Sequence, residues 1–287
     1  MGILWVTTKK SNVYIYNGNS WQRRGSVEGN GENAIAVAPN GDIYVGSDSL
    51  LYRSTNGGTS WNTVFTIGRY NYIEEIIISN SGEVYFATNN NVYVPDNSSW
   101  RRVTTNGLSD HSIIVYPIAL APNGTLYATE GDPTSPTVRC YIIRSTDAGN
   151  SWLRSTTFFT YPVYRLTIVD NNTMFAAASR NGILKSTDGG QNWVRCDTIS
   201  GGNPWAWEIS YNSKMGMLFA DIDFNISCNA FISTDLGENW EMKNGNLRNP
   251  GFGQYCFAFN PITGDTYLRL GSYSANIFYG PVYRFAQ

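Results

Sequence analysis

The stretch RSTDAGNSW, from Arg144 to Trp152, combines a serine, a threonine, an aspartate and a tryptophan within nine residues. Taken alone, that combination suggests a catalytic loop. The stretch recurs, however, as RSTNGGTSW ending at Trp61, KSTDGGQNW ending at Trp193 and ISTDLGENW ending at Trp240. Two degenerate copies, YNGNSW and VPDNSSW, end at Trp21 and Trp100. The stretch is therefore one copy of a repeat that runs along the chain.

The spacing of the repeat predicts its architecture. Successive motif tryptophans lie 39 to 52 residues apart, and a period near 40 in strand-rich units is typical of β-propeller blades. A second signature keeps the same period, because APNGDIYVG (38–46) recurs as SNSGEVYFA (79–87) and APNGTLYAT (121–129). Turn residues followed by a short β-rich run predict a hairpin in each unit.

One unit accordingly predicts four strands, denoted a to d. In the best-defined unit these are NAIAVA, DIYVGS, LLYRST and SWNTVF. The Asn-Gly turn joins strand a to strand b, and the repeated motif joins strand c to strand d. No segment has the periodicity of an amphipathic helix. Four antiparallel strands repeated radially form a propeller blade, so we expect an all-β β-propeller.

We expect residues 1–287 to form a single propeller domain. The chain begins with three strands of one blade, continues through five complete units and ends with three further strands, which makes 26. That number is two fewer than seven full blades need and two more than six need. Seven blades are favoured, with the terminal strands closing the ring, and six blades are the alternative. Closure would protect the sheet edges from aggregation.

The pattern S-T-D-x-G-x-x-W resembles the Asp-box, or BNR repeat, of the sialidase-like β-propellers. The matching residues are Ser145, Asp147, Gly149 and Trp152; Ser186, Asp188, Gly190 and Trp193; and Ser233, Asp235, Gly237 and Trp240. In the copy that ends at Trp61, Asn56 replaces the aspartate. The resemblance places the motif in the c–d turn. A structural role fits, because a short acidic side chain accepts hydrogen bonds from turn amides and the tryptophan buries a large apolar surface. Calcium-dependent turns are a minor alternative, since the extra carboxylates of a Ca²⁺ loop are missing.

Composition excludes several classes of function. The formal net charge is −2, and no run of Lys and Arg exceeds two residues, so nucleic-acid binding is not expected. No apolar run approaches the ~18 residues of a membrane span. The four cysteines form no CxxC pair and His111 is the only histidine, so we expect no metal and no cofactor.

The N-terminus MGILWVTTKK lacks the features of a signal peptide. We expect a secreted, periplasmic or cell-surface monomer whose signal peptide has been removed, with a cytoplasmic location as the alternative.

A binding site is expected on the face opposite the motif turns, where the b–c and d–a loops lie. Two b–c loops are extended, TEGDPTSPTVR (129–139) and ADIDFNISCN (220–229), and the d–a loops GRYNY (68–72), FFTYPVY (158–164) and GGNPWAW (201–207) carry aromatic residues. Flat rings beside polar groups suit sugars. The expected ligand-binding residues are Tyr70, Tyr161, Trp205 and Trp207. Alternatively, these rings fill the channel or pack between blades.

Candidates for catalysis on this face are Glu130, Asp132, Asp221 and Asp223. A glycoside hydrolase needs two carboxylates roughly 5–10 Å apart, and Glu130 and Asp221 are the pair expected to face each other across a cleft. The commoner explanation is that these are solvated loop acids. A sialidase is disfavoured, because the sequence has no Arg-Ile-Pro element.

Two functions fit these observations. We favour a carbohydrate-binding propeller, with carbohydrate processing by a glycoside hydrolase as its catalytic form. The alternative is a non-catalytic scaffold for proteins or peptides, of the sorting-receptor or assembly-factor type. The expected partner is therefore a glycan or a protein ligand.

Overall fold

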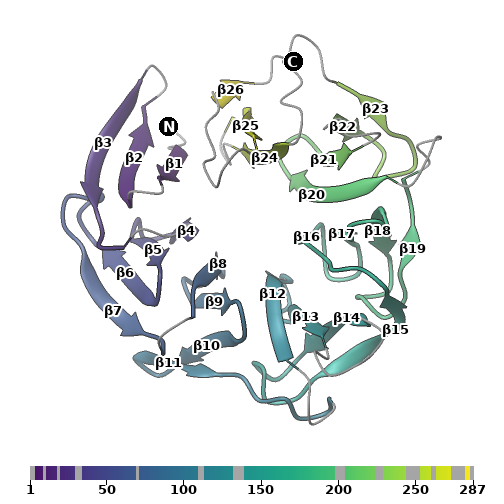
Figure 1. The fold of residues 1–287 in the computed structure, drawn as a ribbon, viewed down its shortest axis with the longest axis horizontal. Coiled ribbons are helices and arrows are strands. Elements are labelled where there is room, and N and C mark those ends of the chain that lie inside the picture. The colour runs from purple at the N-terminus through teal and green to yellow at the C-terminus, as the bar shows by residue number, and fades with distance from the viewer. Residues whose placement is uncertain are drawn as a thin grey trace. The chain divides into compact units, whose positions relative to one another are not determined.

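The structure is a computed structural model of the chain, and it is all-β (Figure 1). It describes residues 4–8, 11–17, 20–29, 34–68, 71–108, 113–131, 139–197, 204–223, 229–243, 253–259, 263–272 and 282–284. Within these ranges the regular secondary structure consists of β-strands alone. The 26 strands form seven sheets. The predicted fold class, with seven sheets and three strands in the first and the last, is confirmed.

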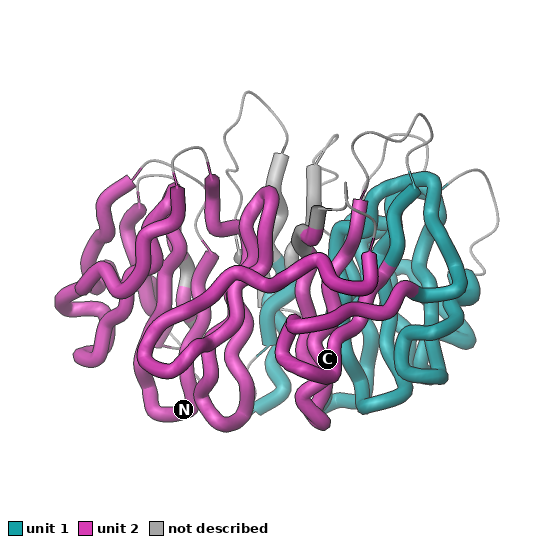
Figure 2. The backbone as a smooth tube through the Cα atoms, turned by 90° about the horizontal axis from the view of Figure 1, so that it is seen from below, with its two compact units in different colours: residues 1–2, 135–141, 155–287 teal, residues 3–134, 142–154 magenta. Residues whose placement is uncertain are grey.

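The chain divides into two compact units (Figure 2). Unit 2 comprises Ile3–Thr134 and Ile142–Arg154, and unit 1 comprises Met1–Gly2, Ser135–Tyr141 and Ser155–Gln287. The first three sheets of the chain belong to unit 2. They are β1 (Leu4–Thr7), β2 (Asn12–Tyr16) and β3 (Trp21–Ser26); β4 (Ala34–Val37), β5 (Ile43–Ser47), β6 (Leu50–Ser54) and β7 (Asn62–Thr66); and β8 (Ile73–Ile78), β9 (Val84–Thr88), β10 (Val92–Asp96) and β11 (Ser99–Arg102).

The boundary between the units falls within the next sheet. That sheet consists of β12 (Ile113–Leu120), β13 (Leu126–Gly131), β14 (Cys140–Ser145) and β15 (Leu153–Phe159). The last three sheets belong to unit 1. They are β16 (Arg165–Ile168), β17 (Met174–Ala177), β18 (Ile183–Ser186) and β19 (Val194–Arg195); β20 (Trp205–Asn212), β21 (Met217–Asp223), β22 (Ala230–Ser233) and β23 (Glu241–Met242); and β24 (Gly253–Phe259), β25 (Thr266–Ser272) and β26 (Val282–Arg284).

Tight turns of one kind join the first and second strands of three sheets. Gly41, Gly82 and Gly124 have φ angles of 90°, 90° and 83°. Each glycine amide donates to the carbonyl three residues earlier at 2.9 Å. Glycine adopts this positive φ without steric cost. The Asn-Gly and Ser-Gly positions of the repeat are therefore the hairpin turns that the sequence predicts.

Burial falls from the second strand of a sheet to the fourth. All residues of β5 and β9 are buried, whereas Val194 of the short strand β19 is 70% exposed. The second strands are covered on both faces because neighbouring sheets stack. Within unit 2, strand β4 packs against β8 and β8 against β12; within unit 1, β16 packs against β20 and β20 against β24. First strands thus lie beside first strands, and fourth strands form the solvent edge.

Apolar side chains fill the space between stacked sheets. In unit 2 the cluster includes Leu51, Ile73 and Phe86, and in unit 1 it includes Phe175, Ile209 and Leu218. Burial of these side chains supplies the main driving force for stacking. Functional residues are therefore expected at the ends of the strands, where turns and loops leave this rigid core.

Candidate ligand-binding site

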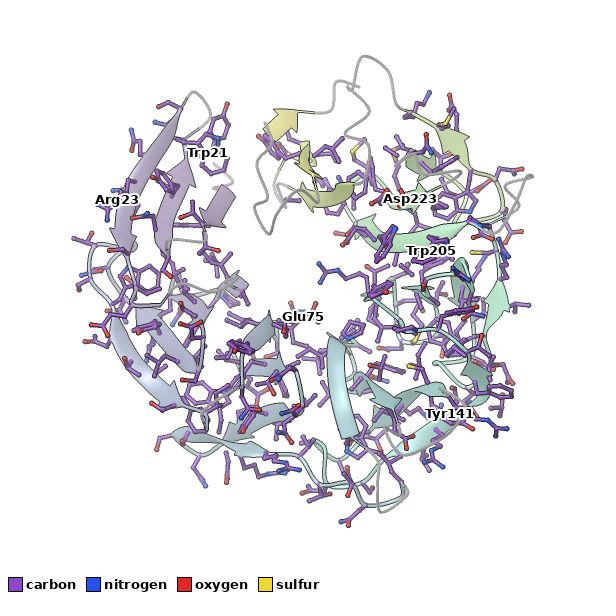
Figure 3. The ribbon with its side chains drawn as sticks, in the orientation of Figure 1. Trp21, Arg23, Glu75, Tyr141, Trp205 and Asp223 are labelled. Carbon is purple, nitrogen blue, oxygen red and sulfur yellow. The ribbon has the colours of Figure 1, made fainter. Side chains whose placement is uncertain are left out.

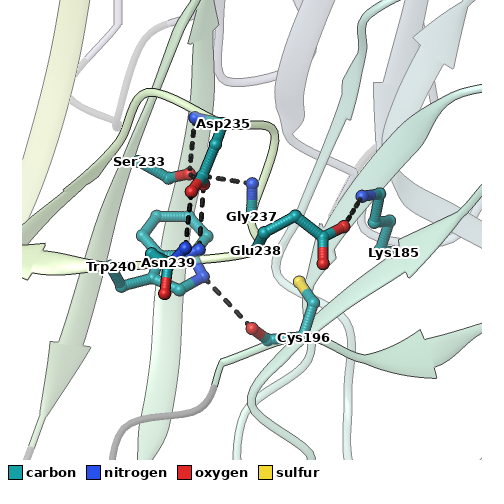
Figure 4. Close-up of polar contacts among 8 residues, drawn as sticks. All are labelled: Lys185, Cys196, Ser233, Asp235, Gly237, Glu238, Asn239 and Trp240. Atoms are coloured by element: carbon teal, nitrogen blue, oxygen red, sulfur yellow. Dashed lines mark hydrogen bonds and ion pairs between the residues drawn. The ribbon is translucent and has the colours of Figure 1, made fainter.

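The repeated motif occupies the turn between the third and fourth strands of four sheets, and its polar groups form the same bonds in each. Ser145 Oγ donates to Asp147 Oδ1 at 2.7 Å and accepts the Gly149 amide at 2.8 Å. Asp147 Oδ1 also accepts the Ser151 amide at 2.9 Å. The copies that begin at Ser186 and Ser233 repeat this pattern, and Figure 4 shows the second of them. In the fourth copy the amide oxygen of Asn56 takes the place of the carboxylate.

In two of its copies the motif also connects a sheet to the one before it. Trp152 is 1% exposed, and its indole Nε1 donates to the Thr104 carbonyl at 3.0 Å. The Trp152 amide donates to the carbonyl of Asn106 at 2.9 Å. In unit 1 the indole of Trp240 donates in the same way to the Cys196 carbonyl at 3.2 Å (Figure 4). The motif is therefore an inter-sheet connection as well as a turn.

The motif carboxylates are not poised for chemistry. Hydrogen bonds, the side chain of Ser151 first among them, lower the pKa of Asp147 to about 2. The Asn239 amide and side chain, with Ser233, lower the pKa of Asp235 to about 2. Carboxylates this acidic stay ionised at neutral pH and cannot act as general acids.

A pocket of about 340 Å³ lies beside the β22–β23 motif turn in unit 1, and its lining includes Lys185, Cys196 and Glu238. Lys185 Nζ and Glu238 Oε1 form an ion pair at 2.7 Å across it (Figure 4). Burial raises the pKa of the Cys196 thiol to about 12. The thiolate is the reactive form of cysteine, and at neutral pH this group stays protonated.

Aromatic rings gather at the other end of the strands in unit 1. The Trp205 and Trp207 ring centroids are 5.5 Å apart, and Trp207 stacks on Tyr164 at 4.7 Å. The Arg180 guanidinium lies 4.6 Å from the Trp205 ring centroid and 5.4 Å from that of Tyr161. We call these five residues the aromatic cluster.

Backbone contacts hold the aromatic cluster in place. Arg180 lies in the β17–β18 turn, next to Ser179, which is buried and has a φ of 47°. Ser179 and Ala206 exchange both backbone hydrogen bonds, at 3.1 and 2.9 Å, and so tie this turn to the start of β20. The β20–β21 register shifts between Ala206 and Glu208, which leaves Trp207 as the extra residue of a β-bulge. A bulge redirects a side chain, and here it turns the indole toward Tyr164.

Acidic groups border the aromatic cluster on β20 and β21. Trp207 Nε1 donates to Asp223 Oδ2 at 2.8 Å. Asp223 is the register partner of Trp205 on the neighbouring strand (Figure 3). Asp221 is fully buried two residues earlier. Glu208 accepts Arg165 Nε at 3.0 Å and Ser210 Oγ at 2.6 Å. Each of these carboxylates is built into the sheet.

The remaining catalytic candidates lie elsewhere. Glu130, on β13 in unit 2, is 2% exposed, and the Arg154 guanidinium bonds both of its carboxylate oxygens. Asp132 and the expected ligand residue Tyr70 lie outside the described residues. The structure therefore brings Tyr161, Trp205, Trp207 and Asp223 together, and it gives Glu130 a partner of its own.

Two loop assignments made from the sequence are wrong. Trp205 and Trp207 belong to β20 and not to a d–a loop, and Asp221 and Asp223 belong to β21 and not to a b–c loop. The reason is the pairing of β20 with β21, which continues from Asn212 and Met217 to Trp205 and Asp223. The Asp221 side chain is consequently buried, where a solvated loop acid was expected.

Arg180 is a site residue that the sequence did not suggest, whereas Tyr164 lies in the aromatic loop 158–164 but was not among the expected ligand residues. The sequence analysis identified b–c loops of the binding face by their unusual length. The turn SRNG (179–182) contains Arg180 and is too short to stand out in that way. Its Asn-Gly ending does mark a tight turn. An arginine at the tip of such a turn, on the face that carries the aromatic residues, is the signal that was available.

Within the described ranges, no group of three or more His, Cys, Asp or Glu side chains is placed to hold a metal ion. In the same part of the chain, no helix has the length and apolar character that crossing a membrane requires.

Comparison with known proteins identifies the fold of this chain. No protein-family model matches the chain, and neither does any curated protein sequence. Among solved structures, YCF48 bound to D1 peptide matches with a TM-score of 0.67 and 13% identity, covering 99% of this chain and 87% of that one. The WD40 β-propeller domain of Doa1 matches with a TM-score of 0.64 and 11% identity over 93% and 85% of the two chains. This chain is a β-propeller.

A third propeller of similar structure is the GH74 enzyme from Niastella koreensis. It matches with a TM-score of 0.59 and 18% identity, covering 97% of this chain and 50% of the enzyme. At these identities the likeness establishes the fold, and the seven sheets are its blades. Function has to be argued from the site.

Proposed function

We propose that this β-propeller is a non-catalytic glycan-binding protein and that the aromatic cluster is its binding site. The observation that carries the proposal is the gathering of four rings at the strand ends of unit 1. Tyr161 is 36% exposed, and Trp205 and Trp207 are half-buried. Rings that are held in place but still reachable can stack on the C–H face of a pyranose.

Polar groups beside the rings complete a sugar-binding arrangement. Asp223 fixes the Trp207 indole through the 2.8 Å bond, and Arg180 lies over Trp205. Carboxylate and guanidinium groups are suitable partners for sugar hydroxyls. Because the cluster is held by backbone bonds and ring stacking, binding would require little reorganisation.

Binding without catalysis is favoured by how the described acids are held. Arg154 holds both oxygens of Glu130, and Arg165 and Ser210 hold Glu208. A glycoside hydrolase needs one carboxylic acid that can donate its proton to the leaving group. Glu130 and Glu208 are instead engaged in hydrogen bonds within their own blades, which leaves neither of them directed at a leaving group.

The repeated turns support a more specific relationship. We infer that the chain is related to the Asp-box propellers that its motif resembles. The support is the common hydrogen-bond pattern of the four c–d turns, which survives even where Asn56 replaces the aspartate.

A protein or peptide ligand is the second candidate. The observation that favours it is the structural likeness to YCF48 bound to D1 peptide. A peptide side chain could also stack on the exposed part of Tyr161. A screen that contains both ligand classes separates the two candidates.

The proposal is tested by screening the purified protein against a glycan array and a peptide array, followed by titration calorimetry of the hits. We expect glycan binding that Trp205→Ala and Tyr161→Ala each weaken roughly fivefold or more, because the loss of an anchoring aromatic ring costs about 1 kcal/mol or more of binding energy. The matched control is Tyr72→Ala, which removes a ring that is 48% exposed in unit 2 and should leave the affinity unchanged. Binding to peptides alone, or to no glycan, would overturn the proposal.

A further inference from the structure

Arg180 differs from four other arginines of the described chain in how its charge is held. Arg53, Arg154, Arg165 and Arg195 each pair with a carboxylate. Arg180 is exposed and contacts two aromatic rings instead, and none of the ion pairs within the described ranges includes it. Its positive charge is therefore available to a ligand.

The setting of Arg180 gives the guanidinium a defined orientation. The guanidinium lies close to two rings, 5.4 Å from the centroid of Tyr161 and 4.6 Å from that of Trp205. Its backbone is fixed because Ser179 is bonded to Ala206 from both sides. Rings contact a guanidinium through its faces, whereas its N–H groups point outward in the plane. An arginine held in this way offers its planar edge to a bidentate partner such as a carboxylate.

The acids nearby do not satisfy this charge. Asp223 is bound to the Trp207 indole, and Glu208 is bound to Arg165 and Ser210. They do limit how much negative charge the site can accept. The arrangement therefore suits one carboxylate placed at Arg180 better than a dense polyanion.

We propose that Arg180 binds a carboxylate of the ligand, and that the glycan bound by the aromatic cluster is acidic, with a uronic acid residue. This inference rests on the proposed glycan-binding function. The sugar ring packs against the exposed part of Tyr161, and the C6 carboxylate accepts two N–H bonds from Arg180. Because the contact is an exposed ion pair, its contribution falls as salt concentration rises.

The test compares acidic glycans with their own methyl esters, which keep the sugar and remove the charge. Oligomers of galacturonate, glucuronate and mannuronate, each with its ester and its neutral parent hexose, are titrated against the purified protein. We expect at least one acid to bind tenfold or more tightly than its ester. Arg180→Gln should reduce the acid's affinity to that of the ester, and Arg180→Lys should fall between, because lysine keeps the charge but lacks the planar fork.

Controls and outcomes separate this inference from the function on which it rests. Arg102→Gln removes another exposed arginine, on β11 in unit 2, and should leave binding unchanged. Equal affinity for acids and esters, preference for the neutral hexoses, or unchanged binding by Arg180→Gln would overturn the inference and leave glycan binding standing. Binding to none of the glycans, here or on the array, would overturn the proposed function itself.

Discussion

At the scale of single residues, the glycine of one c–d turn has little conformational freedom. Gly149 has a φ of 76°, and a Cβ placed on it would lie 2.4 Å from Cγ1 of Val103 in the preceding blade. We expect Gly149→Ala to lower the free energy of unfolding by about 2–4 kcal/mol, because backbone strain and overpacking both contribute. Equilibrium denaturation in urea measures the change.

Gly124→Ala is the matched control for that substitution. Gly124 has a similar φ of 83°, but a Cβ there would meet nothing within 4 Å. The strain of the positive φ alone should cost about 1 kcal/mol. If both variants lost the same stability, the close approach of a Cβ at position 149 to Val103 would add nothing to the cost of the substitution.

At the scale of the turn, the serine hydroxyl is the central group. Ser145 Oγ is buried and receives the Gly149 amide while donating to Asp147. In Ser145→Ala the buried amide loses its acceptor, which we expect to cost about 1–3 kcal/mol. We expect the same loss of stability when alanine replaces Ser54, Ser186 or Ser233, because each of these hydroxyls accepts its glycine amide at 2.8 to 2.9 Å.

Thermal denaturation of the four variants, one at a time, checks this equivalence. Ser81→Ala serves as the control, because Ser81 is exposed in an a–b turn; it should change stability by less than about 0.5 kcal/mol. If the four motif variants were as stable as Ser81→Ala, the repeated hydrogen bonds would not contribute to the stability of the fold.

Strands were predictable from the sequence to the extent that they follow local patterns. DIYVGS and LLYRST became β5 and β6 because alternating or continuous apolar residues ended at turn residues on both sides. The ends of β20 and β21 were missed because pairing between them, and the bridge from Ser179 to Ala206, extends the sheet into a segment rich in Gly, Asn and Pro. Such non-local bonds have no local signature.

The candidate site was predictable in part for the same reason. Tyr161, Trp205 and Trp207 stood out as aromatic residues on the expected face, and the structure places them close together. Their mutual order depends on a bulge at Trp207 and on Arg180, which comes from a different blade. Which ring faces which group follows from the stacking of neighbouring blades, and a sequence repeat cannot specify that.

At the scale of the whole molecule, the motif aspartates link stability to pH. Hydrogen bonds lower the pKa of Asp147 and Asp235 to about 2, below the ordinary value of 3.8. The pKa of Asp188 is also lowered: burial raises it, but the bonds from Asn192, Ser186 and Gln191 outweigh that effect. A carboxyl group whose folded pKa is depressed stabilises the protein above its unfolded pKa, and this stabilisation is lost as pH falls through the folded value.

We therefore expect a variant with Asp147, Asp188 and Asp235 all changed to Asn to fold, since Asn56 already forms the same turn in another blade. At pH 7 it should be less stable than the wild type, because bonds to a carboxylate are stronger than bonds to an amide. The difference should shrink from pH 4 downward and be largely lost near pH 2, where about half of the Asp147 and Asp235 carboxylates are protonated in the folded state as well. Urea denaturation at pH 7, 4, 3 and 2 follows it, and all other titrating groups cancel between the two proteins. A deficit that stayed constant down to pH 2 would mean that the substitutions disturb packing, and that the charge of these aspartates is not what stabilises the propeller.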